Sequence, residues 1–273
     1  MSEHAAELRR GEGPLVISAP HVGTELPAAL AERLTTVGRT LIDTDWYVDR
    51  LYPFARDLQA TVLSARWSRY LVDLNRDPSG ASLYPGQRTT SVCPVETFEG
   101  EPLYASGDEP GADEIAERVA QYFEPYHAAL RAELERVQAL HGYVVLLDAH
   151  SIWGRLPLLF PGELPDVNLG TNDGRSASPR TIAAAQAAAA ESTYSVVLDA
   201  RFKGGFITRH YGNPLAGVHA VQIELNQRTY LADGSRTAWD DAKAARLSRV
   251  LHRVCSALLA SSALQFGRSS ATG

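Results

Sequence analysis

Short apolar segments that end on polar, chemically active residues recur along this chain, and they constrain its fold more than any other feature. Three of them, at 15–19, 143–147 and 218–223, are typical of short buried strands. Helix-like segments alternate with them, which favours an α/β fold with a mixed, mostly parallel sheet flanked by helices. In such a sheet, the groups just past the carboxyl ends of strands converge on one crevice. We therefore expect the polar residues after these strands to form a single site.

The same patterns predict the remaining elements. Helices are expected at 27–34, 43–58, 112–140, 178–192 and 236–260, and further strands at 61–65 and 70–75. The proline- and glycine-rich segment 78–111 is expected to be a long ordered loop near the mouth of the crevice. We find no linker that separates two cores. A single domain is therefore expected at 14–266, between an N-terminal tail at 1–13 and a C-terminal tail at 267–273.

Composition limits the classes of partner. The 273 residues carry a net charge of -6 and no dense run of lysine and arginine, which argues against nucleic-acid binding. Segment 1–13 lacks the apolar core of a signal peptide, and the longest apolar helical stretch is too short for a membrane span. Cys93 and Cys255 are isolated, so neither a disulfide framework nor a cysteine zinc site is indicated. We expect a soluble, cytoplasmic protein that binds a small molecule.

Two histidines stand where strands end. His21 follows the strand at 15–19, and His150 follows the strand at 143–147. Either one alone is more often a structural residue, but two histidines at strand ends match a zinc site with an open position. Asp43 and Asp45 lie at the start of the helix expected at 43–58, where one carboxylate suffices as a cap. The other carboxylate is then left for function.

Asn75, Arg76 and Glu224 add an anion site and a base. An amide donor beside a guanidinium group suits the binding of a carboxylate. Glu224 directly follows the strand at 218–223, and a buried carboxylate there must be paired or functional. Beside a metal ion, a glutamate is a natural general base. The set indicates a metal-dependent hydrolase for an anionic substrate.

Several motifs occur in a characteristic order: Ser-Ala-Pro-His-Val-Gly-Thr at 18–24, Asp-Thr-Asp-Trp at 43–46, Val-Asp-Leu-Asn-Arg at 72–76, His-Ser at 150–151, Leu-Gly-Thr-Asn-Asp-Gly at 169–174 and Gly-Gly-Phe-Ile-Thr-Arg-His-Tyr-Gly at 204–212. The order resembles the zinc carboxypeptidase superfamily and, within it, the N-formylglutamate amidohydrolases, the deformylases of histidine degradation. The resemblance runs from about 15 to about 230. It implies a zinc-carboxypeptidase-like fold and hydrolysis of the formyl amide of N-formyl-L-glutamate to formate and L-glutamate.

The resemblance also implies roles for single residues. His21 and His150 become ligands of Zn²⁺ or another divalent metal, and Glu224 becomes the catalytic carboxylate. Asn75 and Arg76 match the pair that holds the α-carboxylate of the substrate. Two further roles are implied: Asp73 orients His21, and either Arg69 or Arg66 polarises the scissile carbonyl.

The third metal ligand departs from the superfamily pattern. Carboxypeptidases carry His-x-x-Glu, whereas the third residue after His21 here is Thr24. The deformylase pattern pairs Pro-His-x-Gly-Thr with Asp-Thr-Asp-Trp, so Asp45 is the expected third ligand, with Asp43 and Glu25 as fallbacks. The side-chain carboxylate of the substrate requires a second cation. The candidates around the Gly-Gly pair are Arg209, which we prefer, Arg201 and Lys203.

Three competing hypotheses remain. The first is an amidohydrolase of the same fold that acts on another N-acyl amino acid or a small peptide. The second is a non-catalytic, anion-binding relative, which the intact histidines and glutamate disfavour. The third is a serine hydrolase that uses Ser151, which ranks last because the chain lacks a Gly-x-Ser-x-Gly elbow at that position.

Overall fold

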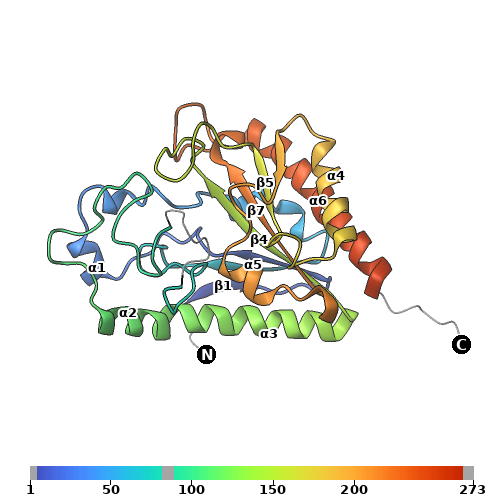
Figure 1. Cartoon of the computed structure of the whole chain (residues 1–273), viewed down its shortest axis with the longest axis horizontal. Helices are drawn as coiled ribbons and strands as arrows, with labels where there is room; N and C mark the ends of the chain where they lie inside the picture. The colour runs from blue at the N-terminus through green and yellow to red at the C-terminus, as the bar shows by residue number, and fades with distance from the viewer. Residues whose placement is uncertain (1–4, 82–88, 267–273) are drawn as a thin grey trace, which may run out of the picture.

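A seven-stranded sheet forms the centre of the molecule, and helices cover both of its faces (Figure 1). The computed structural model describes residues 5–81 and 89–266. The strands are β1 (Ala6–Arg9), β2 (Leu15–Ala19), β3 (Thr61–Ala65), β4 (Val144–Ile152), β5 (Val167–Gly170), β6 (Val196–Leu198) and β7 (Val218–Asn226). Their spatial order is β1-β3-β2-β4-β7-β5-β6. The β1–β3 and β5–β7 pairs are antiparallel and the other four neighbouring pairs are parallel, which confirms the mixed, mostly parallel sheet.

The helices form the two outer layers. They are α1 (Ala28–Arg33), α2 (Ala112–Arg118), α3 (Glu124–His141), α4 (Pro179–Ala190), α5 (Phe206–Tyr211) and α6 (Asp241–Phe266). α3 and α5 cover one face of the sheet, and α4 and α6 cover the other (Figure 1). Successive side chains of the central strand β4 alternate between the two cores: Val145 packs on the α4–α6 side and Val144 on the α3 side. Burial on both faces explains the uninterrupted apolar runs in the sequence. None of the described helices is both long enough and apolar enough to cross a bilayer.

The strands at the centre of the sheet are longer than the sequence predicts. β4 continues beyond residue 147 and β7 beyond residue 223, so that His150 and Glu224 lie within the strands. The two residues are direct neighbours in the parallel register of these strands. His150 and Glu224 therefore project from two neighbouring strands near the centre of the sheet.

The prediction of a helix at 43–58 is wrong. The segment folds into turns and two short 3₁₀ helices, Val48–Leu51 and Pro53–Ala55. Tyr47 adopts a left-handed conformation with φ of 60°, and Pro53 cannot continue an α-helix that precedes it. Asp43 therefore caps no α-helix, and the bent backbone directs Asp45 into the interior, where it is 1% exposed.

The prediction of a strand at 70–75 is also wrong. The backbone there forms turns, and the side chain of Asp73 accepts a hydrogen bond from the backbone N–H of Asn75 at 2.9 Å. Such a local side-chain bond offers the backbone an alternative to a sheet ladder. The described parts of the segment 78–111 contain no helix or strand of two or more residues, as expected for a loop, whereas 82–88 lie outside the described residues.

β5, β6 and α5 are elements that the sequence did not predict, and the largest remaining differences concern both ends of the chain and the helix expected at 112–140. Residues 6–9, expected in an N-terminal tail, form the edge strand β1. The helix expected at 112–140 consists of α2, a π-helical turn (Val119–Phe123) and α3. The last helix begins at Asp241 rather than 236 and extends to Phe266. The C-terminal tail expected at 267–273 lies outside the described residues.

Candidate active site

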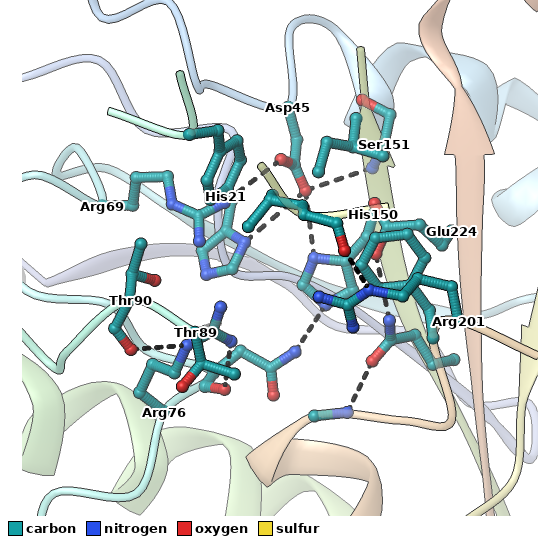
Figure 2. A pocket seen from close by; sticks show the side chains of 17 residues that line it. His21, Asp45, Arg69, Arg76, Thr89, Thr90, His150, Ser151, Arg201 and Glu224 are labelled. Atoms are coloured by element: carbon teal, nitrogen blue, oxygen red, sulfur yellow. Dashed lines mark hydrogen bonds and ion pairs between the residues drawn. The ribbon is translucent and has the colours of Figure 1, made fainter. Parts of the chain in front are cut away.

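A pocket opens at the carboxyl ends of β2, β4 and β7, the edge of the sheet where the sequence places the polar motifs. Its lining consists of His21, Asp45, Arg69, Asn75, Arg76, Thr89, Thr90, Phe98, His150, Ser151, Ile152, Leu159, Arg201, Phe202, Gly205, Gln222 and Glu224. Figure 2 shows Asp45 directed toward the rings of His21 and His150. Residues from distant parts of the chain thus converge as expected.

His21, Asp45 and His150 form a compact group of metal-ligand type. The Nδ1 atom of His150 lies 3.0 Å from Asp45 Oδ2, and the Nδ1 atom of His21 lies 3.6 Å from the same oxygen. The ligand atoms of the three residues all lie within 4.8 Å of one another. Two ligand atoms at about 2.1 Å from a tetrahedral ion are about 3.4 Å apart, so these separations suit one shared ion.

Each of the two histidines is oriented by a second aspartate. His21 Nε2 lies 2.7 Å from Asp73 Oδ1, and His150 Nε2 lies 2.9 Å from Asp148 Oδ1. An ionised carboxylate can only accept, so His21 Nε2 carries the hydrogen. His150 Nε2 also lies 2.9 Å from Asn75 Nδ2, so both Asp148 and Asn75 contact this nitrogen. The expected contact between Asp73 and His21 is therefore present, and Asp148 repeats it for His150.

The donor set fits a divalent metal ion. His21 Nδ1 is buried and has no hydrogen-bond partner among the described residues. His150 lies between Asp45 and Asp148; burial opposes its charged form, but these carboxylates outweigh burial and raise its pKa well above the usual value. An excess of negative charge around two imidazole nitrogens that face inward is the environment that a cation requires.

Arg69 connects the metal group to the loop that covers it. Its guanidinium group donates to Asp73 Oδ2 at 2.5 Å and lies 3.8 Å from Asp45 Oδ1. The ring of Phe98 stacks 4.6 Å from the guanidinium carbon. Asp43 fixes this loop, because its carboxylate accepts from the backbone N–H of Phe98 and from the hydroxyl of Tyr70. Asp43 is thus an anchor beside the site and not part of the group of three.

Glu25, a candidate third ligand, and Arg66, a candidate for the carbonyl-polarising arginine, pair with each other. Arg66 Nε donates to Glu25 Oε1 at 2.7 Å, and both side chains are nearly half exposed. Neither residue lines the pocket. Among the candidates for each role, the structure therefore brings Asp45 and Arg69 to the pocket.

Glu224 is a buried carboxyl group with one side-chain donor among the residues that the structure describes. It is 7% exposed, and its Oε2 accepts a hydrogen bond from Gln222 Nε2 at 3.1 Å. Burial raises the pKa of Glu224 to about 8, the nearby Asp45 adds to this shift, and His150 opposes it. A carboxyl group with a pKa near neutrality can both accept and release a proton.

Three arginines bring positive charge to the pocket. Arg69 lies at the metal group, Arg76 donates to the backbone oxygens of Asn75 and Thr90, and Arg201 donates to the Leu159 oxygen at 2.8 Å (Figure 2). Arg201 also lies 5.2 Å from the ring of Phe202. The pocket is therefore suited to a small molecule with more than one negative group.

Lys203 and Arg209, the other two cations of the Gly-Gly region, do not line the pocket. Lys203 binds Asp173 at 2.8 Å, and Arg209 donates to the Gly204 oxygen and to Asn172 Oδ1. These contacts hold both side chains against the loop of residues 169–174. Arg201, not the preferred Arg209, is the member of this group that lines the pocket.

Ser151 lacks the surroundings of a nucleophile. Its hydroxyl oxygen lies 2.7 Å from the hydroxyl of Tyr230, while its backbone N–H donates to Asp45 Oδ2. The neighbouring His150 is committed to the two aspartates described above. The geometry therefore gives no support to a serine hydrolase.

The sequence patterns assigned no role to Asp148, Gln222 or Phe98. Asp148 precedes His150 by two residues and Gln222 precedes Glu224 by two, so each lies on the same strand face as a functional residue. That period of two is the signal that could have identified them. Phe98 carries no comparable signal, because it reaches the pocket through an irregular loop.

Comparisons with known proteins identify one family. A family model described as N-formylglutamate amidohydrolase matches residues 13–231, a range that includes every site residue named above. The N-formylglutamate deformylase of Pseudomonas putida is 45% identical over 260 residues, which cover 95% of this chain and 97% of the relative. That of Pseudomonas aeruginosa is 45% identical over 259 residues, with coverage of 94% and 97%. The crystal structure of N-formylglutamate amidohydrolase from Ralstonia eutropha JMP134 has a TM-score of 0.77 at 25% identity and covers 95% of this chain and 98% of its own.

Proposed function

The chain belongs to the N-formylglutamate amidohydrolase family, and from that premise we propose that it hydrolyses N-formyl-L-glutamate to formate and L-glutamate, the last step of a histidine degradation route. The observation that carries the proposal is the pair of buried histidines that present Nδ1 to the carboxylate of Asp45, beside a buried glutamate and three arginines. Two nitrogen ligands and one carboxylate are typical of catalytic zinc sites, so we propose Zn²⁺ as the ion held by these residues. Bound there, the ion would polarise the formyl carbonyl and acidify a water molecule.

The protein residues supply binding and proton transfer. Glu224 takes a proton from the water that attacks the formyl carbon and delivers it to the nitrogen of glutamate as the carbon–nitrogen bond breaks. Arg69 stabilises the negative charge that develops on the formyl oxygen, because its guanidinium group is held at the pocket by Asp73. Formate and the free amine of glutamate then leave.

The two carboxylates of the substrate need separate cations. We assign the α-carboxylate to Arg76, next to Asn75, and the side-chain carboxylate to Arg201. The support is that both guanidinium groups line the pocket and are anchored through backbone oxygens. Anchored arginines lose little freedom when they bind a carboxylate in bidentate geometry.

The rates of hydrolysis of three N-acyl glutamates test the proposed reaction. The purified protein, reconstituted with one equivalent of Zn²⁺, is incubated with N-formyl-, N-acetyl- and N-succinyl-L-glutamate, and free amine is measured for each. We expect turnover of the formyl substrate in the usual range of enzymes, above about 1 s⁻¹, and slower turnover of the larger acyl groups. Faster hydrolysis of either larger acyl group would replace this proposal with the broader N-acyl amino acid hydrolase.

Replacement of Arg201 by alanine tests the second cation. We expect Arg201→Ala to raise KM for N-formyl-L-glutamate at least about 10-fold, since a hydrogen bond to a charged group is worth about 1.5–3 kcal/mol and Arg201 is partly buried. KM for N-formyl-L-glutamine, which has the same length and a neutral side chain, is expected to change less than about threefold. Arg76→Ala is expected to raise KM for both substrates.

The control for this comparison is Arg155→Ala. Arg155 is an exposed arginine that pairs with Glu163 and does not line the pocket. We expect this variant to behave as wild type with both substrates. An equal rise in KM for N-formyl-L-glutamate and N-formyl-L-glutamine in Arg201→Ala would contradict the assignment of the side-chain carboxylate to Arg201.

A further inference from the structure

Two amide side chains in the pocket share one arrangement. Asn75 Oδ1 accepts from the backbone N–H of Ile207 at 2.8 Å, and Gln222 Oε1 accepts from the backbone N–H of Gly205 at 2.7 Å. Both donors belong to the first residues of α5 and its cap. Since an N–H group can only donate, each contact fixes which end of the amide carries oxygen and which carries nitrogen.

The nitrogen end of each amide is thereby directed at a different functional carboxylate. Asn75 Nδ2 donates to Asp148 Oδ2 at 3.2 Å and also lies 2.9 Å from His150 Nε2. Gln222 Nε2 donates to Glu224 Oε2 at 3.1 Å. Asp148 also accepts from the hydroxyl of Thr208 at 3.1 Å, again from α5. Asp148 in turn binds His150, so α5 is connected to both the metal group and the catalytic carboxylate.

Gly205 allows the backbone of α5 to approach the side-chain amide of Asn75 closely. A Cβ atom on Gly205 would lie 2.4 Å from Asn75 Nδ2 and 2.5 Å from Asn75 Cγ, a distance at which the amide must move. The backbone of Gly205 also lines the pocket. The requirement for glycine is thus one of space at the amide of Asn75 and does not arise from backbone conformation, since Gly205 has φ of -83°.

We propose that the segment 205–208 is a positioning element that aligns the two halves of the active site through the amides of Asn75 and Gln222. Asn75 and Thr208 hold Asp148, and both Asn75 and Asp148 contact Nε2 of the His150 imidazole. Gln222 holds the carboxylate of Glu224. The proposal rests on the proposed function, because it takes His150 as a metal ligand and Glu224 as the proton carrier. It gives the Gly-Gly-Phe-Ile-Thr motif a role distinct from substrate binding.

Different measurements test the two connections of α5: the metal branch, through Asn75 and Asp148, and the proton-transfer branch, through Gln222 and Glu224. Gln222→Met removes both hydrogen bonds of Gln222 at similar size. We expect kcat for N-formyl-L-glutamate to fall about 10-fold or more, because a misplaced proton carrier costs rate, with KM and the zinc dissociation constant unchanged within about twofold. Asn75→Leu and Asp148→Asn are expected to weaken zinc about 10–100-fold in competition with a chromophoric chelator, the usual cost of losing the partner of a ligand.

Gly205→Ala should disturb both branches together, and Gly212→Ala is its matched control. A Cβ atom on Gly212 would also be crowded, 2.4 Å from Ser176 Cβ and 2.7 and 2.8 Å from the backbone Cα and O atoms of Ser176, but at the other end of α5 and away from both amides. We expect weaker zinc binding and lower kcat in Gly205→Ala alone, although Gly212→Ala should lower the melting temperature at least as much because it meets backbone atoms. Co²⁺-substituted protein gives an independent signal, because the visible spectrum of the ion should change in Gly205→Ala.

Zinc affinity and the Co²⁺ spectrum require no substrate, so they test the metal branch even where another N-acyl amino acid is the true substrate. Two results would overturn the proposal. One is a Gln222→Met variant with wild-type kcat. The other is a Gly205→Ala variant that matches Gly212→Ala in zinc affinity and cobalt spectrum.

Discussion

Replacement of Glu224 by glutamine is expected to lower kcat at least about 100-fold while metal content and KM stay close to wild type, within the range usual for general acid–base groups. The amide keeps the size of the side chain and still offers an oxygen to Gln222, but it cannot take a proton from water. Glu224 is buried and lies directly beside His150 in the sheet register, so its loss removes the carboxylate nearest to the metal group on β7. Steady-state kinetics with N-formyl-L-glutamate and elemental analysis of the same sample measure both quantities.

The control for Glu224 is another buried carboxylate. Glu133 in α3 is 1% exposed and binds Arg10 and Arg136, outside the pocket. Glu133→Gln is expected to lower the melting temperature and to retain kcat. A Glu224→Gln variant with more than about a tenth of wild-type kcat would assign the proton transfer to another group.

Replacement of His150 by alanine is expected to abolish stoichiometric zinc binding, and activity with it. The variant leaves Asp45 and His21 with one ligand too few for a catalytic site of three protein ligands. The loss of affinity should exceed the about 10–100-fold expected for the aspartate partners of the histidines. Zinc content after dialysis, and competition with a chelator, give the measurement.

His219→Ala separates loss of the ligand from general damage. His219 is fully buried at the other end of β7, where it accepts from the backbone N–H of Ser178. Its replacement is expected to destabilise the protein without loss of zinc. Full zinc occupancy in His150→Ala would refute the metal group, as would full activity of the wild-type protein after exhaustive chelation.

The sequence predicted the sheet well where local and global preferences agree. The segments at 15–19, 143–147 and 218–223 are apolar because β2, β4 and β7 are buried on both faces. Because these strands are parallel neighbours, the polar side chains at their carboxyl ends converge. Asp45, Arg69 and Arg201 were each one of several candidates for a role, but the sequence could not choose among them. That choice depends on which side chains reach the pocket across loops.

The errors also have physical causes. Segment 43–58 has helical periodicity, but the left-handed Tyr47 and Pro53 turn the chain so that Asp45 meets His150, a tertiary contact that outweighs local preference. The strand expected at 70–75 is replaced by turns because Asp73 binds the backbone of its own segment as well as His21. Both errors fall on functional segments, where tertiary requirements oppose local rules.

The position of β4 between β2 and β7 also bears on how the molecule folds. His150 is 105 residues from Asp45, and the register partners of β4 lie far before and far after it in the chain. Closing such long loops costs conformational entropy before the strands make any stabilising contacts, so strand pairings of this range form late and slowly. No partly folded chain that lacks either neighbour of β4 can hold the complete set of reacting groups. During refolding, the return of catalytic turnover should therefore report the last step of sheet assembly, after helix formation is already visible by circular dichroism.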